Sequence, residues 1–124
     1  MKQVEYLEQV KLFEWARLYA SKHRCLKWLN SSQNGVRITN PMGAVRAKKA
    51  GMSKGFPDIF LPYPTQSYAG LFIELKRPIV KGQSKPIVSK EQKEWLEYLN
   101  SVNYKAVVCY GANEAIQTIC DYIA

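Results

Sequence analysis

The chain has 124 residues, 47% of them hydrophobic, and its 18 Lys and Arg against 10 Asp and Glu give a formal net charge of +8. This size fits a single domain, residues 1–124, built around one core. No apolar run approaches the roughly 20 residues that a membrane-spanning helix needs. The three cysteines are widely spaced and odd in number, which argues against a disulfide framework. We therefore expect a cytoplasmic protein with no membrane segment and no small-molecule cofactor.

The first expected element is an amphipathic helix at about residues 4–21. Six apolar residues recur along it at helical spacing, namely Val4, Leu7, Leu12, Trp15, Ala16 and Tyr19. Glu8 lies within this apolar stripe, where a charged side chain is unusual and its presence has to be explained. One reason is structural, an ion pair with Lys11 or Lys27 at the margin of the stripe. The other is a functional role, and the spacing alone leaves both open.

The next part of the chain is basic. A strand is expected at about residues 26–29, a polar turn at 30–35, with Asn34-Gly35 as its signal, and an extended piece at 36–39. Asn40-Pro41 is typical of a helix start and Gly51 of its end. From Ser21 to Pro57 there is no acidic residue but eight basic ones, namely Lys22, Arg24, Lys27, Arg37, Arg46, Lys48, Lys49 and Lys54. A polyanion is the natural partner, although a generally basic, solubilising surface is the simpler alternative.

A predicted antiparallel hairpin follows, with strands at Asp58 to Leu61 and Leu71 to Lys76. Alternation places Glu74 and Lys76 on one face of the second strand. If the hairpin is symmetric about Gln66, Asp58 lies opposite Glu74. Two facing carboxylates are unfavourable unless one is protonated or a cation lies between them, and Mg²⁺ prefers such oxygen ligands. The alternative is a solvated edge strand, which a Glu-x-Lys pair alone does not exclude.

The rest of the chain completes an α/β pattern. Residues 77–88 form a basic loop with Lys81 and Lys85, and Ser89 with Gln92 fits a capping box. The helix that follows is expected to face inward through Trp95, Leu96, Leu99 and Val102. A buried strand at 104–110 and a helix at 113–123 end the outline αββαββαβα. This order predicts a mixed β-sheet flanked by α-helices on both faces.

These motifs together resemble a known family. Gly55-x-Pro57-Asp58 followed by Ile73-Glu74-Leu75-Lys76 resembles the PD-(D/E)xK nuclease superfamily, which has a restriction-endonuclease-like core, and more narrowly the VRR-NUC domain. The resemblance covers nearly the whole chain, from Glu8-Gln9 through Ser89-x-Glu91-Gln92 to the closing segment that starts at Cys109. Small stand-alone proteins of this family look like phage or bacterial enzymes that act on branched DNA such as Holliday junctions or flaps.

The resemblance implies an Mg²⁺- or Mn²⁺-dependent endonuclease. It assigns metal binding to Asp58, Glu74 and the main-chain carbonyl of Leu75, and the placing of the attacking water to Lys76. Glu8 is our choice for the first-helix glutamate that often joins such a site, with Glu5 as the alternative. Gln92 is explained by the capping box or by a contact at the active site.

The remaining implications concern partners. Nucleic-acid binding falls to the basic residues Arg37, Arg46, Lys48, Lys49, Lys54, Lys81 and Lys85, and the resemblance also puts Asn34 near DNA. Two symmetric cuts in a junction call for a homodimer, for which Phe13, Trp15 and Tyr19 offer apolar surface. Two other functions stay open, a non-catalytic nucleic-acid-binding module and a sequence-specific restriction-type nuclease.

Overall fold

The computed structural model describes residues 3–32 and 40–124, in which a mixed four-stranded sheet forms the centre. The strands are β1 (Asn30–Ser31), β2 (Ile59–Leu61), β3 (Leu71–Lys76) and β4 (Lys105–Tyr110), and they lie side by side in this order. The pairs β1–β2 and β2–β3 are antiparallel, whereas β3 and β4 are parallel. The predicted hairpin is therefore confirmed as β2 and β3.

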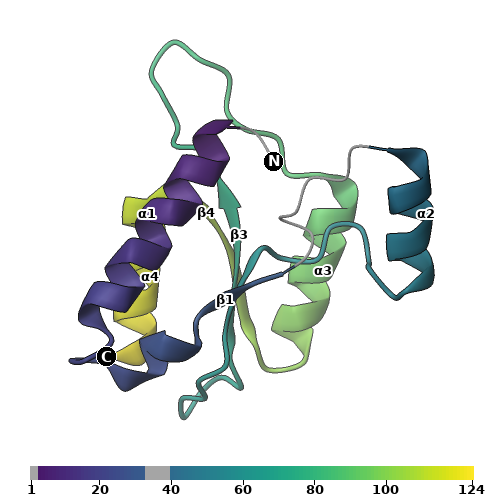
Figure 1. Ribbon diagram of the computed structural model, residues 1–124. Coiled ribbons are helices and arrows are strands. Elements are labelled where there is room, and N and C mark those ends of the chain that lie inside the picture. Colours follow the sequence, from purple (N-terminus) through teal and green to yellow (C-terminus); the bar gives the residue numbers. More distant parts are fainter. Residues whose placement is uncertain (1–2, 33–39) are drawn as a thin grey trace.

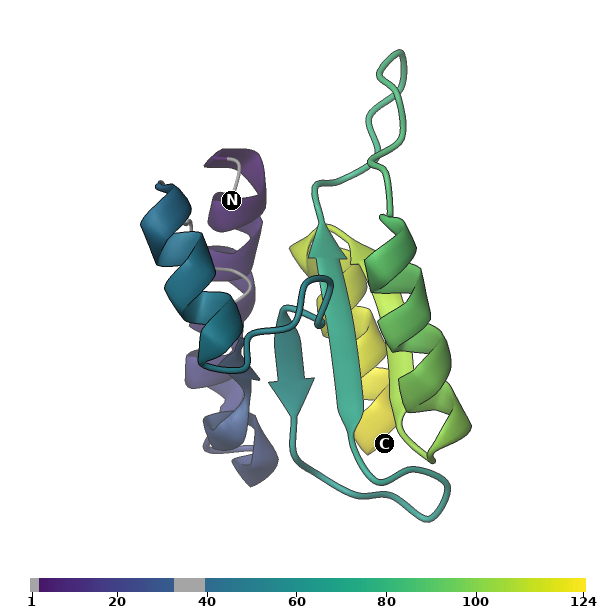
Figure 2. The same cartoon turned by 90° about the vertical axis from the view of Figure 1, so that its right-hand side faces the viewer.

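Helices cover both faces of the sheet (Figures 1 and 2). The helices α1 (Gln3–Tyr19) and α4 (Ala112–Ile123) pack on one face, and α3 (Lys90–Ser101) packs on the other. The short basic helix α2 (Pro41–Lys49) lies apart from the sheet, on the same side as α3 in Figure 1 but toward the opposite edge in Figure 2, and it buries none of its residues. The expected α/β class, a mixed sheet flanked by helices, is confirmed.

Strand β3 is buried along its whole length because both of its faces are covered. Leu71, Ile73 and Leu75 belong to the larger core cluster, under α1 and α4. Phe72 belongs to a second cluster, under α3, where its ring stacks on Phe60. The alternation predicted from sequence thus holds, and it places Glu74 and Lys76 on the α3 side of the sheet, where both side chains are buried.

Two helix starts follow local sequence signals. The side chain of Asn40 accepts a hydrogen bond from the Gly43 amide at 2.6 Å, with Pro41 as the first helical residue. At α3 both halves of the Ser89–Gln92 capping box are present. These predictions are confirmed because each depends only on residues within one turn.

Other expectations were wrong. The strand expected at residues 26–29 is a 3₁₀ helix, Arg24–Trp28, which buries Leu26 and is followed by the buried Leu29. Their spacing of three suits a 3₁₀ turn, which brings residues i and i+3 to one side. Within α1 only Leu12 and Ala16 are buried, while Val4 and Leu7 are about half exposed.

Some expectations lie outside or at the edge of the described structure. The polar turn expected at residues 30–35 was wrong in its first part, because Asn30–Ser31 form strand β1 and pair with β2. The rest of that turn from residue 33 on and the extended piece at 36–39 fall outside the described residues. Val102, expected to face inward, is 40% exposed. Within the described part of the chain, no helix is both long and apolar enough to cross a membrane. All three cysteines are free thiols, and Cys109 is buried.

Candidate active site

The hairpin register brings two acids together. Ile59 pairs with Ile73, Phe60 with Phe72 and Leu61 with Leu71. One further step in the same register sets Asp58 opposite Glu74, as the symmetric hairpin predicts. Both side chains are buried, at 9% and 3% exposure. Two carboxyl groups therefore face each other at the end of β3, shielded from bulk water.

Each of these two acids has protein donors. Asp58 Oδ2 accepts a hydrogen bond from the Leu75 amide at 3.0 Å. Glu74 Oε2 accepts one from Gln92 Nε2 at 3.1 Å and lies 3.8 Å from Lys76 Nζ. The structure thus joins Asp58, Glu74, Lys76 and Gln92 in one cluster, although they come from β3, from α3 and from the loop before β2.

The electrostatics of the pair follow from its burial. The pKa of Glu74 is raised from 4.5 to about 9, mainly by burial and next by the neighbouring Asp58 carboxylate. The positive charge of Lys76 lowers this pKa, but only in part. Burial also raises the pKa of Asp58, which Glu74 and the Leu75 amide lower in part. Without a cation between them, the two groups cannot both carry a charge cheaply near neutral pH. Perturbed carboxyls that line a cavity are typical of functional sites.

The glycine of the Gly-x-Pro-Asp motif holds α3 against this cluster. Gly55 has φ +88°, and a Cβ added to it would lie 2.6 Å from the carbonyl carbon of Glu91 and 2.7 Å from the Gln92 amide nitrogen. Only a residue without a side chain allows this approach. The side chain of Gln92 makes two hydrogen bonds, one in the helix cap and one to the acidic pair. Its Oε1 accepts from the Ser89 amide at 2.8 Å, and its Nε2 binds Glu74.

The first helix contributes differently from our expectation. The contacts of the Glu8 carboxylate are with the Ala112 amide and with Lys11 rather than with the acidic pair. Its Oε1 accepts from the Ala112 amide at 2.9 Å, at the start of α4, and its Oε2 lies 3.3 Å from Lys11 Nζ. An acid stabilises the positive end of a helix dipole, which accounts for its position in the stripe. The charge of Glu5 makes a small contribution that raises the pKa of both Asp58 and Glu74, after the larger effect of burial.

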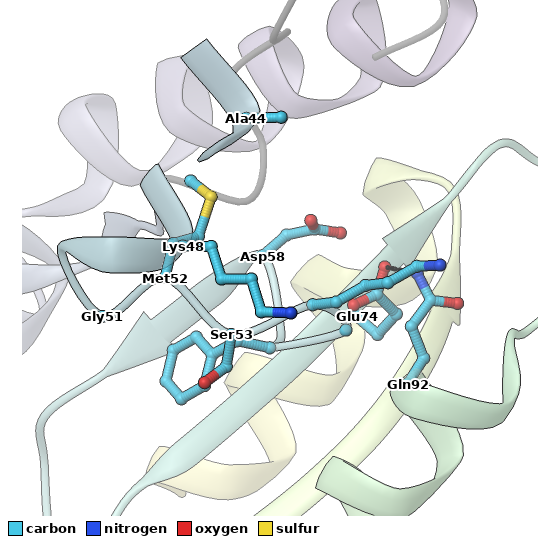
Figure 3. A pocket seen from close by; sticks show the side chains of 11 residues that line it. Ala44, Lys48, Gly51, Met52, Ser53, Asp58, Glu74 and Gln92 are labelled. Atoms are coloured by element: carbon cyan, nitrogen blue, oxygen red, sulfur yellow. Dashed lines mark hydrogen bonds between the residues drawn. The ribbon is translucent and has the colours of Figure 1, made fainter. Parts of the chain in front are cut away.

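A cavity of about 810 Å³ opens onto the pair. Asp58, Glu74 and Gln92 line it together with Lys48 of α2 (Figure 3). Lys54, in the loop that follows α2, also belongs to the lining. Apolar walls come from Ala44, Met52 and Phe56 and the rest from Gly51, Ser53 and Gly55. Cations and carboxyls thus share one space, which suits an anionic substrate.

The other basic candidates are more scattered. Arg46 and Lys49 are exposed on α2, and Lys81 and Lys85 are exposed in the loop between β3 and α3. Arg37 and Asn34 lie outside the described residues. The cavity lining identifies Lys48 and Lys54 as the predicted DNA contacts that lie beside the acidic pair. Sequence reasoning had not singled out Met52, Ser53 or Phe56, because small and apolar residues before a motif carry no charge pattern.

The donor atoms fit a hard divalent cation. Within residues 3–32 and 40–124, no group of three or more His, Cys, Asp and Glu could hold a metal. Mg²⁺ needs fewer protein ligands than this, since it is often bound by one or two carboxylates, and water and substrate phosphate complete its coordination shell. Main-chain N–H and C=O groups of one extended residue point to the same edge, so the Leu75 carbonyl faces the side from which Asp58 approaches. Two carboxyls and one carbonyl form an all-oxygen set.

The fold and this cluster define the class. A mixed sheet with an Asp, then Glu-x-Lys on the neighbouring strand, is the core of a nuclease-type α/β domain, consistent with the PD-(D/E)xK superfamily. The sequence matches the VRR-NUC domain over residues 4–113. The chain belongs to the VRR-NUC family.

A comparison of structures agrees with this assignment. A solved structure described as a VRR_NUC domain protein superposes with a TM-score of 0.75 and 26% sequence identity. The match covers 99% of this chain and 90% of the other chain. No curated protein matches the sequence significantly. The family assignment therefore rests on the domain match and the structural match, and the VRR-NUC domain is a nuclease-type domain, which implies DNA as its substrate.

Proposed function

We propose that this protein is a Mg²⁺- or Mn²⁺-dependent endonuclease that hydrolyses DNA phosphodiester bonds and prefers branched DNA. The facing Asp58 and Glu74 carboxyls carry the proposal. Their burial keeps a proton on the pair, and a divalent cation is the charge that lets both ionise. Asp58, Glu74 and the Leu75 carbonyl would hold the ion. When bound, it would supply Lewis-acid activation of water and neutralise charge on the phosphate.

The residues around the pair have distinct tasks in this proposal. The Lys76 ammonium, 3.8 Å from Glu74 Oε2, positions the attacking water and donates to the scissile phosphate. Gln92 orients Glu74 through its 3.1 Å hydrogen bond. Lys48 and Lys54 bind phosphates near the reacting group, since both line the same cavity as the acidic pair. Glu5, rather than Glu8, supplies the first-helix acid, through its charge or through water.

The test of catalysis compares Lys76→Ala with Lys105→Ala. Lys105 lies at the other end of the parallel β3–β4 pair, opposite Leu71, and serves as a matched strand lysine. We expect Lys76→Ala to lower Mg²⁺-dependent cleavage by about a hundredfold or more, as loss of a transition-state donor does, with DNA affinity nearly unchanged. Lys105→Ala should cleave normally. Wild-type binding without cleavage under any divalent ion would instead identify a non-catalytic binding module.

The branched-DNA preference is tested on linear, flapped and four-way DNA of equal length and sequence content. We expect the four-way and flapped forms to be cut faster. Equal rates on all three would refute the preference but not the nuclease chemistry. Cleavage at one fixed sequence whatever the shape would favour the restriction-type alternative.

A homodimer is the assembly we propose for paired cuts. Phe13 and Trp15 pack against the core in part, so they offer less surface than expected from sequence. Leu18, at 75% exposure, and Tyr19, at 44%, remain apolar and exposed near the end of α1. Sedimentation of the wild type and of Leu18→Asp tests this surface. A monomeric wild type at assay concentration would contradict the proposal.

A further inference from the structure

The loop at residues 77–88 stands out from the body of the protein. It leaves the end of β3 and returns to the start of α3, and both views show it extending well beyond the helices (Figures 1 and 2). Three aliphatic side chains on it are exposed, Ile79 at 54%, Val80 at 45% and Ile87 at 84%. Single exposed apolar residues are ordinary, but several on one projecting loop are more often part of an interaction site.

The ends of this loop are fixed to the active site. Lys76 directly precedes it, and Gln92 lies in the first turn of α3, just after it. Both contact the same oxygen, Glu74 Oε2, at 3.8 Å and 3.1 Å. A substrate phosphate beside Lys76 would therefore have the two stems of the loop next to it.

The loop is also braced from within. Arg77 Nη2 donates to the Ser84 carbonyl at 2.6 Å and so ties the two sides of the loop together. At its base, a Cβ on Gly111 would lie 3.0 Å from Pro78 Cγ, so this proline packs closely against the start of α4. Near its tip, Gly82 has φ +85° and the Gln83 amide donates to the Val80 carbonyl at 3.0 Å. The apolar side chains are thus presented on an organised support.

The charge of the loop suits DNA. Lys81 and Lys85 are exposed on it, and no acidic residue occurs between Lys76 and Glu91. Lys85 Nζ lies 5.0 Å from the centre of the Tyr110 ring, which places this cation near the base of the loop. Aliphatic side chains flanked by cations are the combination with which proteins enter a base step while gripping the phosphates beside it.

We propose that residues 77–88 form a wedge, in which the exposed Ile87 inserts at the branch point of bound DNA and opens the adjacent base step, while Ile79 and Val80 add apolar contact with the DNA. This inference rests on the proposed nuclease function and extends it by naming a residue that selects the DNA structure. Opening a base step costs a few kcal/mol, and it costs less where the step is already unpaired. Ile87 therefore contributes most where the enzyme itself must open the step.

The first experiment measures base unstacking without cleavage. A four-way junction carries 2-aminopurine next to its branch point, and Ca²⁺ replaces Mg²⁺. Wild-type protein should raise the fluorescence severalfold, Ile87→Ala should leave it near the level of free DNA, and Ile87→Leu should restore most of the rise. Val102→Ala, an exposed aliphatic residue at the far end of α3, is the control and should behave as wild type.

The second experiment measures cleavage in Mg²⁺. Ile87→Ala should lower kcat/KM about tenfold on a fully paired junction, and less than twofold on a matched junction with unpaired bases at its centre. Equal losses on both substrates, or a wild type that binds without a fluorescence rise, would overturn the wedge. Failure of the nuclease function looks different, because no substrate would then be cut, while the fluorescence measurement would still report on the wedge.

Discussion

Replacing Glu74 by Gln should change how the stability of the metal-free protein depends on pH. Glu74 has an ordinary pKa of 4.5, and burial together with Asp58 raises it to about 9 in the folded protein. The unfolded chain therefore releases this proton at a lower pH than the folded one. The stability that the bound proton confers is complete below pH 4.5, and it is lost as the pH rises toward 9.

The size of the effect follows from the shift. Between pH 4.5 and 9 the free energy of unfolding should fall by about 1.4 kcal/mol per pH unit because of this group. At pH 7.5 the loss reaches about 4 kcal/mol, which is a large part of the stability of a small domain. Gln at position 74 keeps the shape and an acceptor for Gln92 but has no proton to lose. The variant should therefore be more stable than wild type at pH 7.5.

The assay is urea unfolding at pH 5, 6, 7 and 8 in EDTA, with Glu97→Gln, an exposed acid on α3, as the control. Wild type and the control should lose stability with rising pH relative to Glu74→Gln. Saturating Mg²⁺ should then stabilise the wild type at pH 7.5 far more than the Gln variant, because only the wild type has both ligands. Parallel pH profiles for Glu74→Gln and wild type would refute the argument that this carboxyl is held protonated.

Five further substitutions test the parts around the acidic pair. Gly55→Ala should destabilise the fold by about 2 kcal/mol or more, because the φ of Gly55 is +88° and the new Cβ would clash with the backbone of α3. Gly82→Ala should cost only about 1 kcal/mol, since its φ is also positive but nothing lies within 4 Å of the added Cβ. Thermal unfolding of the two variants measures this difference. Gln92→Ala should cost about 1 kcal/mol of stability through the cap and also reduce cleavage. Glu8→Gln should lower stability with little effect on cleavage, and Glu5→Gln should do the reverse, as thermal unfolding and initial cleavage rates would show.

Two comparisons make these predictions decisive. Ser89→Ala removes the capping hydroxyl but leaves the Gln92 amide beside Glu74, so it should match Gln92→Ala in stability while cleaving at nearly the wild-type rate. Equal loss of cleavage in both variants would mean that Gln92 acts only as a cap. If Glu8→Gln abolished cleavage in a fully stable protein, the sequence-based choice of Glu8 would be restored.

The amino-acid sequence by itself determined the features that depend on short-range order. Alternation along β3 and the turn that centres on Gln66 set which residues face each other, because a one-residue slip would reverse every side chain of a strand covered on both faces. The start of α2 at Asn40 and the capping box of α3 are equally local. The acidic pair and Lys76 could be predicted for this reason.

Tertiary structure decided what each side chain meets across the fold. Glu8 and Glu5 lie one turn apart on α1, and only the packing of α4 shows that the first binds the Ala112 amide. The capping role of Gln92 could be predicted from sequence alone. Its contact with Glu74 could not, because that contact depends on the close approach of Gly55 to α3. Leu26 and Leu29 formed a 3₁₀ turn where a strand was expected, because their burial depends on α1 and the sheet. Such contacts join residues far apart in the chain, and no local pattern encodes them.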